Sequence, residues 1–497
     1  MPSGPLCDNR GLRRALIPCL LAVACLLAAQ RFEDPKAPEV VAPSERSTIE
    51  PQPHPGGTFH REPKPLSDEA VTEDWPGFLG KSGEPVSLET RILKEYGTEG
   101  PLLVWELSKG TGYSSPSIQG HYLVYIHREG REEIVECLHA ETGERFWRYA
   151  YPTDFEDRFG YNNGPRSSPV IDGDRVYVYG AQGKLHSLAL RTGQVLWRRD
   201  IGTEFGVPQD FFGTSTTPII EGDLLILNIG APGGPEVAAF DKNDGRMIWG
   251  AGDLWGPSYA TPVARSIRGK RLLFVFAGGE SSPPTGGLLS LDPLDGAPQF
   301  RFPWRSRSYE SVNASCPVVV GNKVLVSASY RTGAALLAVE SDGSYTKEWE
   351  NPDFDLHWTT ALYDNGHFYA FSGRNEPDAS LTCVRALTGE TVWSEALEWQ
   401  ETVQIQGEPR TIYGSPYRGN LLKVDGKFLA LGEHGHLLWL DLSPKGPRVL
   451  GRWRLFLARE TWSPPVLSRG LLYVSQNTRA FDRRAGPRLL CYDLRGE

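Results

Sequence analysis

The chain has 497 residues, 40% of them hydrophobic and 23% charged, so it contains enough apolar material for a packed protein. Its net charge of −9 argues against a nucleic-acid partner, because the phosphate backbone binds basic surfaces. A single hydrophobic core rarely grows beyond about 250–300 residues, so this length requires several units or a repeat.

The first 29 residues predict a secretory signal peptide. Arg10, Arg13 and Arg14 precede a mostly apolar stretch from Ala15 to Ala29. This stretch is short for a membrane span, which needs about 20 apolar residues. We therefore expect export to the periplasm or the exterior with cleavage near Ala29. The alternative is an uncleaved leader that anchors the protein in the membrane.

Residues 30–73 predict a disordered linker, because they are rich in Pro and Glu and carry few large apolar side chains. Order is expected to resume at residue 74, where Trp75 and Phe78 are predicted to pack on the outer wall of the domain that follows. This domain is predicted to cover residues 74–497.

One pattern recurs eight times between about residue 100 and the end, at a mean spacing of about fifty residues. A repeat of this period is typical of a solenoid, a propeller or an array. Each copy opens with small residues, in most copies hydroxyl residues, that lead in most copies into a proline. The openings are Ser114-Ser115-Pro116, Ser167-Ser168-Pro169, Thr216-Thr217-Pro218, Ala260-Thr261-Pro262, Ser315-Cys316-Pro317, Thr359-Thr360-Ala361, Gly414-Ser415-Pro416 and Ser463-Pro464-Pro465.

The copy at residues 167–200 shows what one repeat builds. Short apolar or β-branched segments alternate with Asp-Gly and Gly-containing turns, which predicts a four-stranded antiparallel meander. Eight such sheets bury their apolar faces best as an eight-bladed β-propeller, an all-β fold. The last copy ends before its outermost strand, and residues 103–107 form a spare strand before the first copy. We predict that residues 103–107 complete the last blade and close the ring.

Most copies end in a turn glycine that is followed four residues later by an aromatic side chain, for example Gly143 and Trp147. Glycine permits the positive φ of such a turn, and a large ring supplies the buried area that holds neighbouring blades together. The predicted blade-docking residues are Trp105, Trp147, Trp197, Trp249 and Trp393.

The third repeat end is the most specific, with Asp241, Asp244, Gly245 and Trp249 in the pattern Ala-x-Asp-x-x-Asp-Gly-x-x-x-Trp. It resembles the tryptophan-docking repeat of quinoprotein propellers, which are named after pyrroloquinoline quinone (PQQ). Over residues 75–497 the chain is similar to the secreted bacterial PQQ-like repeat proteins. That group includes the outer-membrane β-barrel assembly lipoprotein as well as quinoprotein dehydrogenases. The resemblance implies the propeller and leaves the function open, because the fold hosts catalysts and scaffolds.

One enzymatic alternative follows from the resemblance: a PQQ-dependent dehydrogenase that oxidises an alcohol or a sugar. Alcohol dehydrogenases of this type carry adjacent, disulfide-bonded cysteines above the cofactor and a Ca²⁺ ion held by Glu, Asn and Asp. This sequence has no adjacent cysteines, and no residues match the calcium ligands or the base. His434 and His436 flank a tight turn without further zinc ligands. We therefore predict no catalytic residue, metal or cofactor, with PQQ and calcium as the alternative.

Candidate binding residues occupy the position three residues before each repeat opening's proline, where a loop is expected to enter the innermost strand near the mouth of the central channel. Five of these eight positions are aromatic. Rings combined with Arg and Asn suit a peptide strand, a glycan or a quinone. The alternative is that the rings only pack between the inner strands. The predicted funnel-mouth residues are Tyr113, Arg166, Tyr259, Trp358, Tyr413 and Trp462, with Asn163 and His357 nearby.

These observations predict an exported, monomeric propeller that acts as a non-catalytic binding or scaffold module in the cell envelope. Its partner is expected to be an envelope protein, a peptide or a glycan at the funnel mouth. A PQQ-dependent quinoprotein dehydrogenase is the alternative function.

Overall fold

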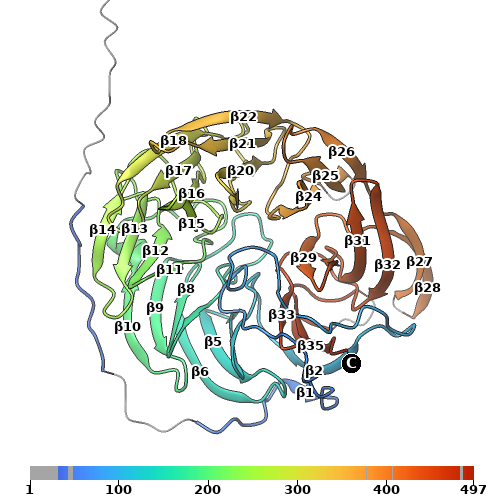
Figure 1. Ribbon diagram of the computed structural model, residues 1–497. Coiled ribbons are helices and arrows are strands. Elements are labelled where there is room, and N and C mark those ends of the chain that lie inside the picture. Colours follow the sequence, from blue (N-terminus) through green and yellow to red (C-terminus); the bar gives the residue numbers. More distant parts are fainter. Residues whose placement is uncertain (1–31, 43–48, 376–377, 406, 482–484, 497) are drawn as a thin grey trace, which may run out of the picture.

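Eight antiparallel sheets surround a central channel in the computed structural model (Figure 1). The structure describes residues 32–42, 49–375, 378–405, 407–481 and 485–496, so the predicted signal peptide lies outside the described residues. Within these ranges the only helix is the four-residue α1 (Ile201–Glu204). The predicted all-β, eight-bladed propeller is confirmed.

Blades 1 to 4 are each built from four consecutive strands, with the first strand innermost. Their bounds are β3 (Ser117–Gln119), β4 (Tyr122–Glu129), β5 (Glu132–His139) and β6 (Arg145–Pro152) in blade 1; β7 (Val170–Asp172), β8 (Arg175–Tyr179), β9 (Lys184–Ala189) and β10 (Val195–Asp200) in blade 2; β11 (Ile219–Glu221), β12 (Leu224–Asn228), β13 (Val237–Asp241) and β14 (Met247–Ala251) in blade 3; β15 (Val263–Ile267), β16 (Lys270–Ala277), β17 (Gly287–Leu291) and β18 (Pro298–Pro303) in blade 4.

Blades 5 to 8 follow the same plan, except that a separate two-stranded hairpin lies between blades 6 and 7 and that blade 8 has three strands from the end of the chain. Their bounds are β19 (Val318–Val320), β20 (Lys323–Ala328), β21 (Gly333–Val339) and β22 (Tyr345–Asn351); β23 (Leu362–Asp364), β24 (His367–Ser372), β25 (Ser380–Arg385) and β26 (Thr391–Glu395); the hairpin β27 (Trp399–Ile405) and β28 (Glu408–Gly414); β29 (Asn420–Val424), β30 (Lys427–Leu431), β31 (His436–Ser443) and β32 (Gly446–Arg454); and β33 (Val466–Ser468), β34 (Leu471–Gln476) and β35 (Arg488–Asp493).

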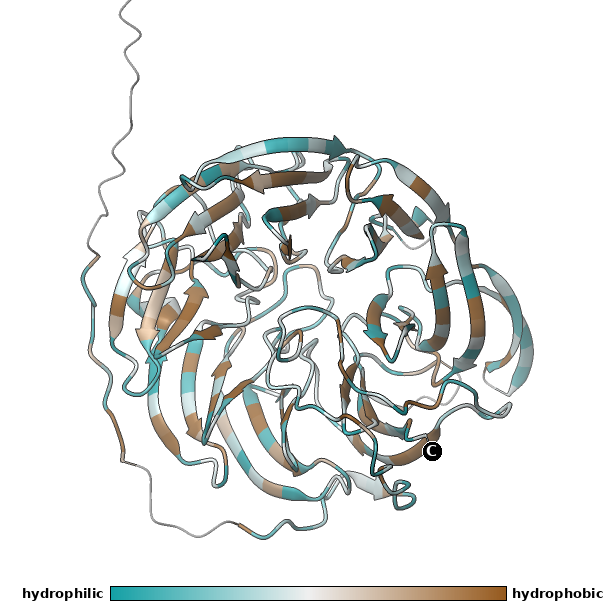
Figure 2. Cartoon of the chain, in the orientation of Figure 1, coloured by the Kyte–Doolittle hydropathy of each residue, from teal (hydrophilic) through white to brown (hydrophobic). Residues whose placement is uncertain are grey.

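The two middle strands of each blade are buried on both faces, because every blade packs between two neighbours. In blade 5, β20 and β21 are almost wholly buried, whereas the outermost strand β22 exposes most of its side chains. The hydropathy colouring shows the same gradient, with hydrophobic residues concentrated in the inner strands and hydrophilic residues frequent in β22 and β32 (Figure 2). The repeat of short apolar segments in the sequence therefore becomes a ring of small cores between blades.

The beginning of the chain closes the ring. β2 (Leu102–Ser108) pairs antiparallel with β35, from Leu102 opposite Asp493 to Ser108 opposite Arg488. It completes blade 8 and contains the predicted closing strand 103–107, so this prediction is confirmed. Outside it, β1 (Gly57–Phe59) adds a fifth strand that was not predicted.

The predicted docking tryptophans bridge consecutive blades. Trp147 in the outermost strand of blade 1 donates its Nε1–H to the backbone oxygen of Leu190 in blade 2, at 2.7 Å. Its ring lies against Gly193, whose φ is +69°, so that a Cβ there would lie 2.6 Å from the indole. Trp105, Trp197, Trp249 and Trp393 make the equivalent hydrogen bonds to Ala140, Lys242, Pro293 and Ser443.

Residues 30–73 carry the composition of a disordered linker, yet their described parts follow the outer wall of the propeller. Asp34 forms an ion pair with Arg199 at 2.6 Å. The backbone N–H of Val41 donates to blade 2 at 2.7 Å, and Gln52 forms a β-bridge to blade 1. Composition reports the average character of this segment, whereas a few specific polar contacts hold it. The domain boundary at residue 74 stays a prediction.

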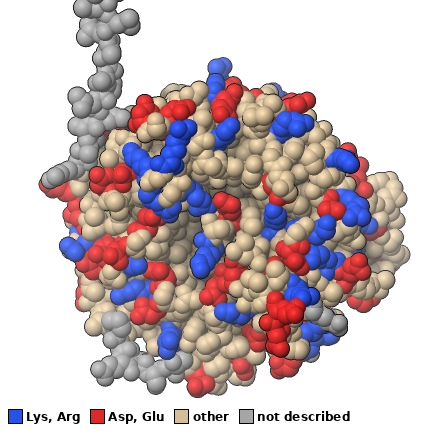
Figure 3. Space-filling view, viewed as in Figure 1, with Lys and Arg blue, Asp and Glu red and all other residues tan. Residues whose placement is uncertain are grey.

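Residues 74–95, here called the strap, cross the channel on the face of the short turns within blades. Trp75 exchanges backbone hydrogen bonds with Ile118 of β3, at 3.0 and 2.7 Å. Farther along, Ser87 donates to Lys423 of blade 7 at 2.8 Å. Figure 1 shows this segment in blue in front of the centre of the ring, and Figure 3 shows acidic and basic side chains interspersed over the same face. Charge alone therefore does not mark a binding surface there.

The prediction that Trp75 and Phe78 pack on the outer wall is wrong. Trp75 is 2% exposed and lies against the innermost strand of blade 1, and Phe78 lines the channel. The physical reason is the free edge of each innermost strand, whose backbone groups face the channel and need hydrogen-bond partners. The strap supplies them at β3, and this brings its aromatic side chains inside the ring.

Candidate functional site

A cavity of about 250 Å³ lies at the end of the channel opposite the strap. The loops that join consecutive blades converge there, together with the turns between the second and third strands of blades 5 and 6. We call this space the mouth cavity. Its aromatic and basic lining residues are Phe78, Tyr113, Tyr161, Phe212, Tyr259, Tyr330, Trp358, Trp462, His357, Arg166, Arg374 and Arg418.

Six of the eight predicted funnel-mouth residues line this cavity: Tyr113, Arg166, Tyr259, His357, Trp358 and Trp462. They come from five different loops between blades, so the ring brings together side chains that are far apart in the sequence. Their role in ligand binding stays a prediction, and packing between the inner strands is visible as well.

Two predicted residues lie elsewhere. Tyr413 is 72% exposed on β28, because the hairpin β27–β28 occupies the sequence before the seventh repeat and carries this position away from the channel. The side-chain oxygen of Asn163 accepts the backbone N–H of Asp157 at 2.8 Å, so Asn163 shapes its own loop. Neither residue lines the mouth cavity.

The aromatic rings of the cavity form a connected layer. The rings of Tyr113 and Trp462 are stacked with centroids 5.0 Å apart, and Trp358 lies 4.8 Å from Trp462. The guanidinium group of Arg418 lies 4.5 Å from the centre of the Trp358 ring. Such cation–π contacts fix a long side chain in one position.

Two of the three arginines are held from behind by buried carboxylates. Arg166 pairs with Asp157 at 2.7 Å, and the Asp157 side chain is fully buried. Arg418 binds Glu433 through Nε at 2.9 Å and through a second, parallel contact, and Glu433 also accepts the indole N–H of Trp462 at 2.6 Å. Bidentate pairing of this kind orients the guanidinium group. The arginines are therefore positioned before any ligand arrives.

The electrostatics of the cavity favour anions. Burial, together with the positive charges of Arg418 and Arg374, lowers the pKa of His357 to about 3, so this imidazole is neutral at physiological pH. Burial and the neighbouring Glu460 carboxylate raise the pKa of Tyr113, which therefore stays a hydrogen-bond donor. No Asp or Glu belongs to the lining, in a protein whose net charge is −9.

These residues do not fit a calcium-bound quinone. Calcium takes six to eight oxygen ligands, usually including carboxylates. The lining supplies only the side-chain oxygens of Asn375 and Asn420 together with hydroxyl groups, and the nearby Asp157 and Glu433 are engaged by arginines. Among the described residues, no group of three or more His, Cys, Asp or Glu could hold a metal ion.

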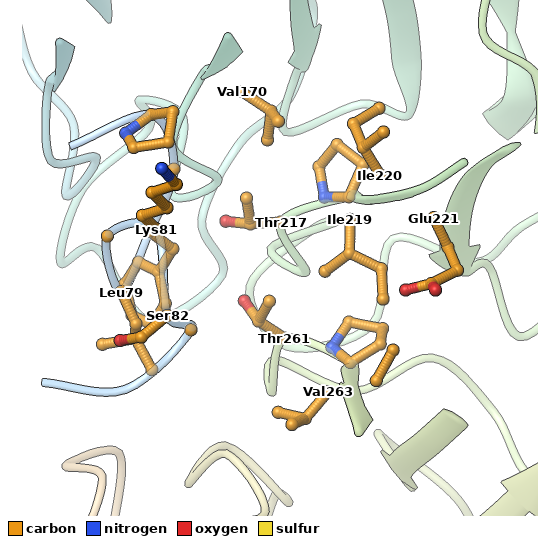
Figure 4. Close-up of a pocket in the computed structure, with 18 of the residues that line it drawn as sticks. Leu79, Lys81, Ser82, Val170, Thr217, Ile219, Ile220, Glu221, Thr261 and Val263 are labelled. Atoms are coloured by element: carbon orange, nitrogen blue, oxygen red, sulfur yellow. The ribbon is translucent and has the colours of Figure 1, made fainter. Parts of the chain in front are cut away.

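Phe78 forms the floor of the mouth cavity. It also lines a second space of about 340 Å³ between the strap and blades 2 to 4, here called the strap cavity. Figure 4 shows Leu79, Lys81 and Ser82 of the strap on one side of the strap cavity and residues of blades 2 to 4, including Ile219 and Ile220, on the other. The strap therefore divides the channel into two compartments.

Several lining residues were missed from the sequence. Tyr330 and Arg374 lie in turns between the second and third strands of blades 5 and 6, and Phe78 belongs to the strap. Arg418 follows a repeat proline by two residues and could have been found by extending the search beyond the positions before each proline. The others carry no periodic signal.

Fold and site together define a β-propeller with an arginine- and aromatic-lined channel mouth. The family model described as outer membrane protein assembly factor BamB matches residues 130–395, and the chain belongs to this family. The BamB protein of Burkholderia pseudomallei (strain K96243) is 30% identical over 120 residues, which are 23% of this chain and 28% of that relative. The match thus spans less than a third of the relative's length.

Solved structures share the fold at low sequence identity. BamB from Moraxella catarrhalis aligns with a TM-score of 0.51 and 14% identity, covering 79% of this chain and 97% of that one. A europium-containing methanol dehydrogenase gives 0.58 and 13%, covering 81% and 89%. The quinohemoprotein alcohol dehydrogenase of Comamonas testosteroni gives 0.59 and 13%, covering 85% and 81%. Within the described residues, no helix has the length and apolar character of a membrane span.

Proposed function

We propose that this protein is an exported, non-catalytic binding module of the cell envelope that takes part in outer membrane protein assembly. Its family carries that description, and one observation in the structure supports a binding role. The mouth cavity combines a connected aromatic layer with arginines that are fixed from behind by Asp157 and Glu433. A preorganised surface of this kind binds a partner with little loss of side-chain freedom. We place the partner, a protein segment, at this mouth.

Site-specific photo-crosslinking in the producing organism tests the proposal. A photoreactive residue at Tyr161, which is 49% exposed at the cavity rim, is expected to crosslink envelope proteins. The matched control places it at Tyr363, which is 36% exposed on the strap side of blade 6. Crosslinks from Tyr161 should disappear with Trp358→Ala. Equal crosslinking from both positions, or products that survive Trp358→Ala, would show that the mouth is not the binding site.

The quinoprotein alternative is separated by a direct assay. Purified protein is incubated with PQQ and Ca²⁺ and supplied with methanol, ethanol or glucose and an electron-accepting dye. We expect no dye reduction above the protein-free control, because the cavity lacks the carboxylates that calcium requires. Substrate-dependent reduction would instead establish a dehydrogenase.

A further inference from the structure

The mouth cavity is a blind end. Phe78 closes it from the strap side, so a chain that enters at the mouth cannot leave through the channel. The volume of about 250 Å³ equals that of roughly eight water molecules in the liquid, which suits one large residue rather than a loop or a helix. An internal segment would need room for two chain passages, whereas a chain terminus needs room for one.

The charge of the cavity distinguishes between the two kinds of terminus. Arg418 donates through Nη1 to the backbone oxygen of Arg374 at 3.0 Å, so the two arginines are neighbours at one side of the mouth. The guanidinium group of Arg374 lies 4.0 Å above the Tyr330 ring, and the described residues place no carboxylate within ion-pair distance of it. Paired guanidinium groups bind carboxylates and repel ammonium groups. A carboxyl terminus fits, and an amino terminus does not.

A row of aromatic rings continues from the cavity across the outer surface. It starts at Trp462, whose ring centroid lies 5.7 Å from that of Tyr161, and consecutive rings along it are 5.5 to 6.2 Å apart. Phe159, Tyr161 and Tyr309 are 51%, 49% and 46% exposed. Exposed apolar surface that is continuous over several side chains marks an interaction site. We call this row the aromatic ridge, and its members are Tyr161, Phe212, Phe159, Phe211 and Tyr309.

We propose that the mouth cavity binds the carboxyl-terminal residue of an extended partner chain. The terminal carboxylate pairs with Arg374 and the accessible side of Arg418. The last side chain is aromatic and packs against Trp358 and Trp462, and the preceding residues lie along the aromatic ridge. This inference rests on the proposed function and specifies the partner: an unfolded or extended polypeptide with an aromatic residue at its free carboxyl end.

Fluorescence anisotropy of labelled peptides on the full chain tests the inference. The probe is a fluorescein-labelled hexapeptide that ends in phenylalanine with a free carboxylate. Matched probes carry a carboxamide instead, or alanine as the last residue. We expect the free acid to bind at least tenfold more tightly than either matched probe. Equal affinity of the acid and the amide, or no binding of the hexapeptide, would overturn the inference.

Variants assign the contacts. Arg374→Gln should weaken the acid probe at least fivefold and the amide probe less than twofold. Arg448→Gln, which removes an arginine that is 70% exposed on blade 7, is the control of equal charge and should change neither. Unchanged melting temperatures exclude misfolding. If Arg374→Gln weakens both probes alike, the terminal carboxylate is not bound there and the inference fails.

A competition assay separates a chain end from a small molecule. Phe159→Ser should weaken the hexapeptide at least threefold but leave competition by N-acetylphenylalanine unchanged, because only the peptide reaches the ridge. Competition by PQQ at a concentration below that of the hexapeptide's own Kd would show a small-molecule site and refute the inference. The proposed function fails separately, through loss of specific crosslinks from Tyr161.

Discussion

Removing the indole at the ring closure, by Trp105→Ala, tests how the propeller is held together. Trp105 lies in β2, the one strand of blade 8 that comes from the beginning of the chain, and it is 1% exposed. Its Nε1–H donates to Ala140 of blade 1 at 2.9 Å, and its ring contacts Gly143. The substitution therefore loosens the junction at which the ring is sealed.

The expected loss follows from burial. Replacing a core tryptophan by alanine costs about 3–5 kcal/mol, which includes the cavity left behind. Trp453 is the matched control, because its ring also contacts a glycine, Gly100, and it donates to Gly97 at 2.9 Å. It is only partly buried and docks on a loop instead of a neighbouring blade. We expect about half the loss, roughly 2 kcal/mol, for Trp453→Ala.

Thermal unfolding followed by circular dichroism measures the difference. With about 2 °C per kcal/mol for a chain of this size, Trp105→Ala should lower the Tm by about 8 °C and Trp453→Ala by about 4 °C. Limited proteolysis should release the N-terminal segment from Trp105→Ala first. If both variants lose the same stability, or if Trp105→Ala stays resistant to protease, the closure does not depend on this docked indole.

Three further predictions concern turns, pH and the site. Gly193→Ala should cost at least about 1–2 kcal/mol more than Gly173→Ala in urea unfolding, because both have positive φ but only Gly193 lies against an indole; equal costs would contradict docking. Burial raises the pKa of Glu401, but its histidine and arginine partners hold it at about 2, below the ordinary value of 4.5. The stability from its ionised form is thus present above pH 4.5 and lost as the pH falls through 2, so Glu401→Gln should lower the Tm at pH 7, and a difference that does not shrink in acid would refute this. Trp358→Ala should weaken the hexapeptide at least tenfold, whereas Tyr413→Ala should leave its anisotropy titration unchanged; a loss with Tyr413→Ala would place the ligand outside the mouth cavity.

The ring could be predicted because its determinants are local and repeated. A turn glycine and a tryptophan four residues later report one blade contact each, and eight opening motifs report eight blades. Trp349 shows the limit of this reasoning. It docks on Gly389 and donates to Ala386 at 3.0 Å, yet it follows Gly343 by six residues and escapes a search for a spacing of four. The structure tolerates the longer turn because β22 keeps its register with β21 through a bulge.

The site could be predicted only where it follows from the repeat. Tyr113 and Trp462 occupy equivalent positions in two repeats, and the ring brings them into stacking distance. Tyr413 has the same spacing to its proline, but the hairpin β27–β28 displaces it. The alternation around Val403 and Ile405, followed by a Gly-containing turn, was a readable hairpin signal.

The strap explains why the remaining lining residues are invisible to periodicity. Phe78 closes the mouth cavity although its neighbours in sequence are glycines and polar residues without any strand pattern. What places it is the hydrogen bonding of Trp75 to the free edge of β3 and of Ser87 to β29, two strands that lie in different blades. A blind cavity, and with it the preference for a chain end, is therefore a property of how the strap crosses an already closed ring. It follows that Phe78→Ala, which keeps both backbone anchors, should join the two cavities and weaken the selectivity for the terminal residue more than the stability of the fold.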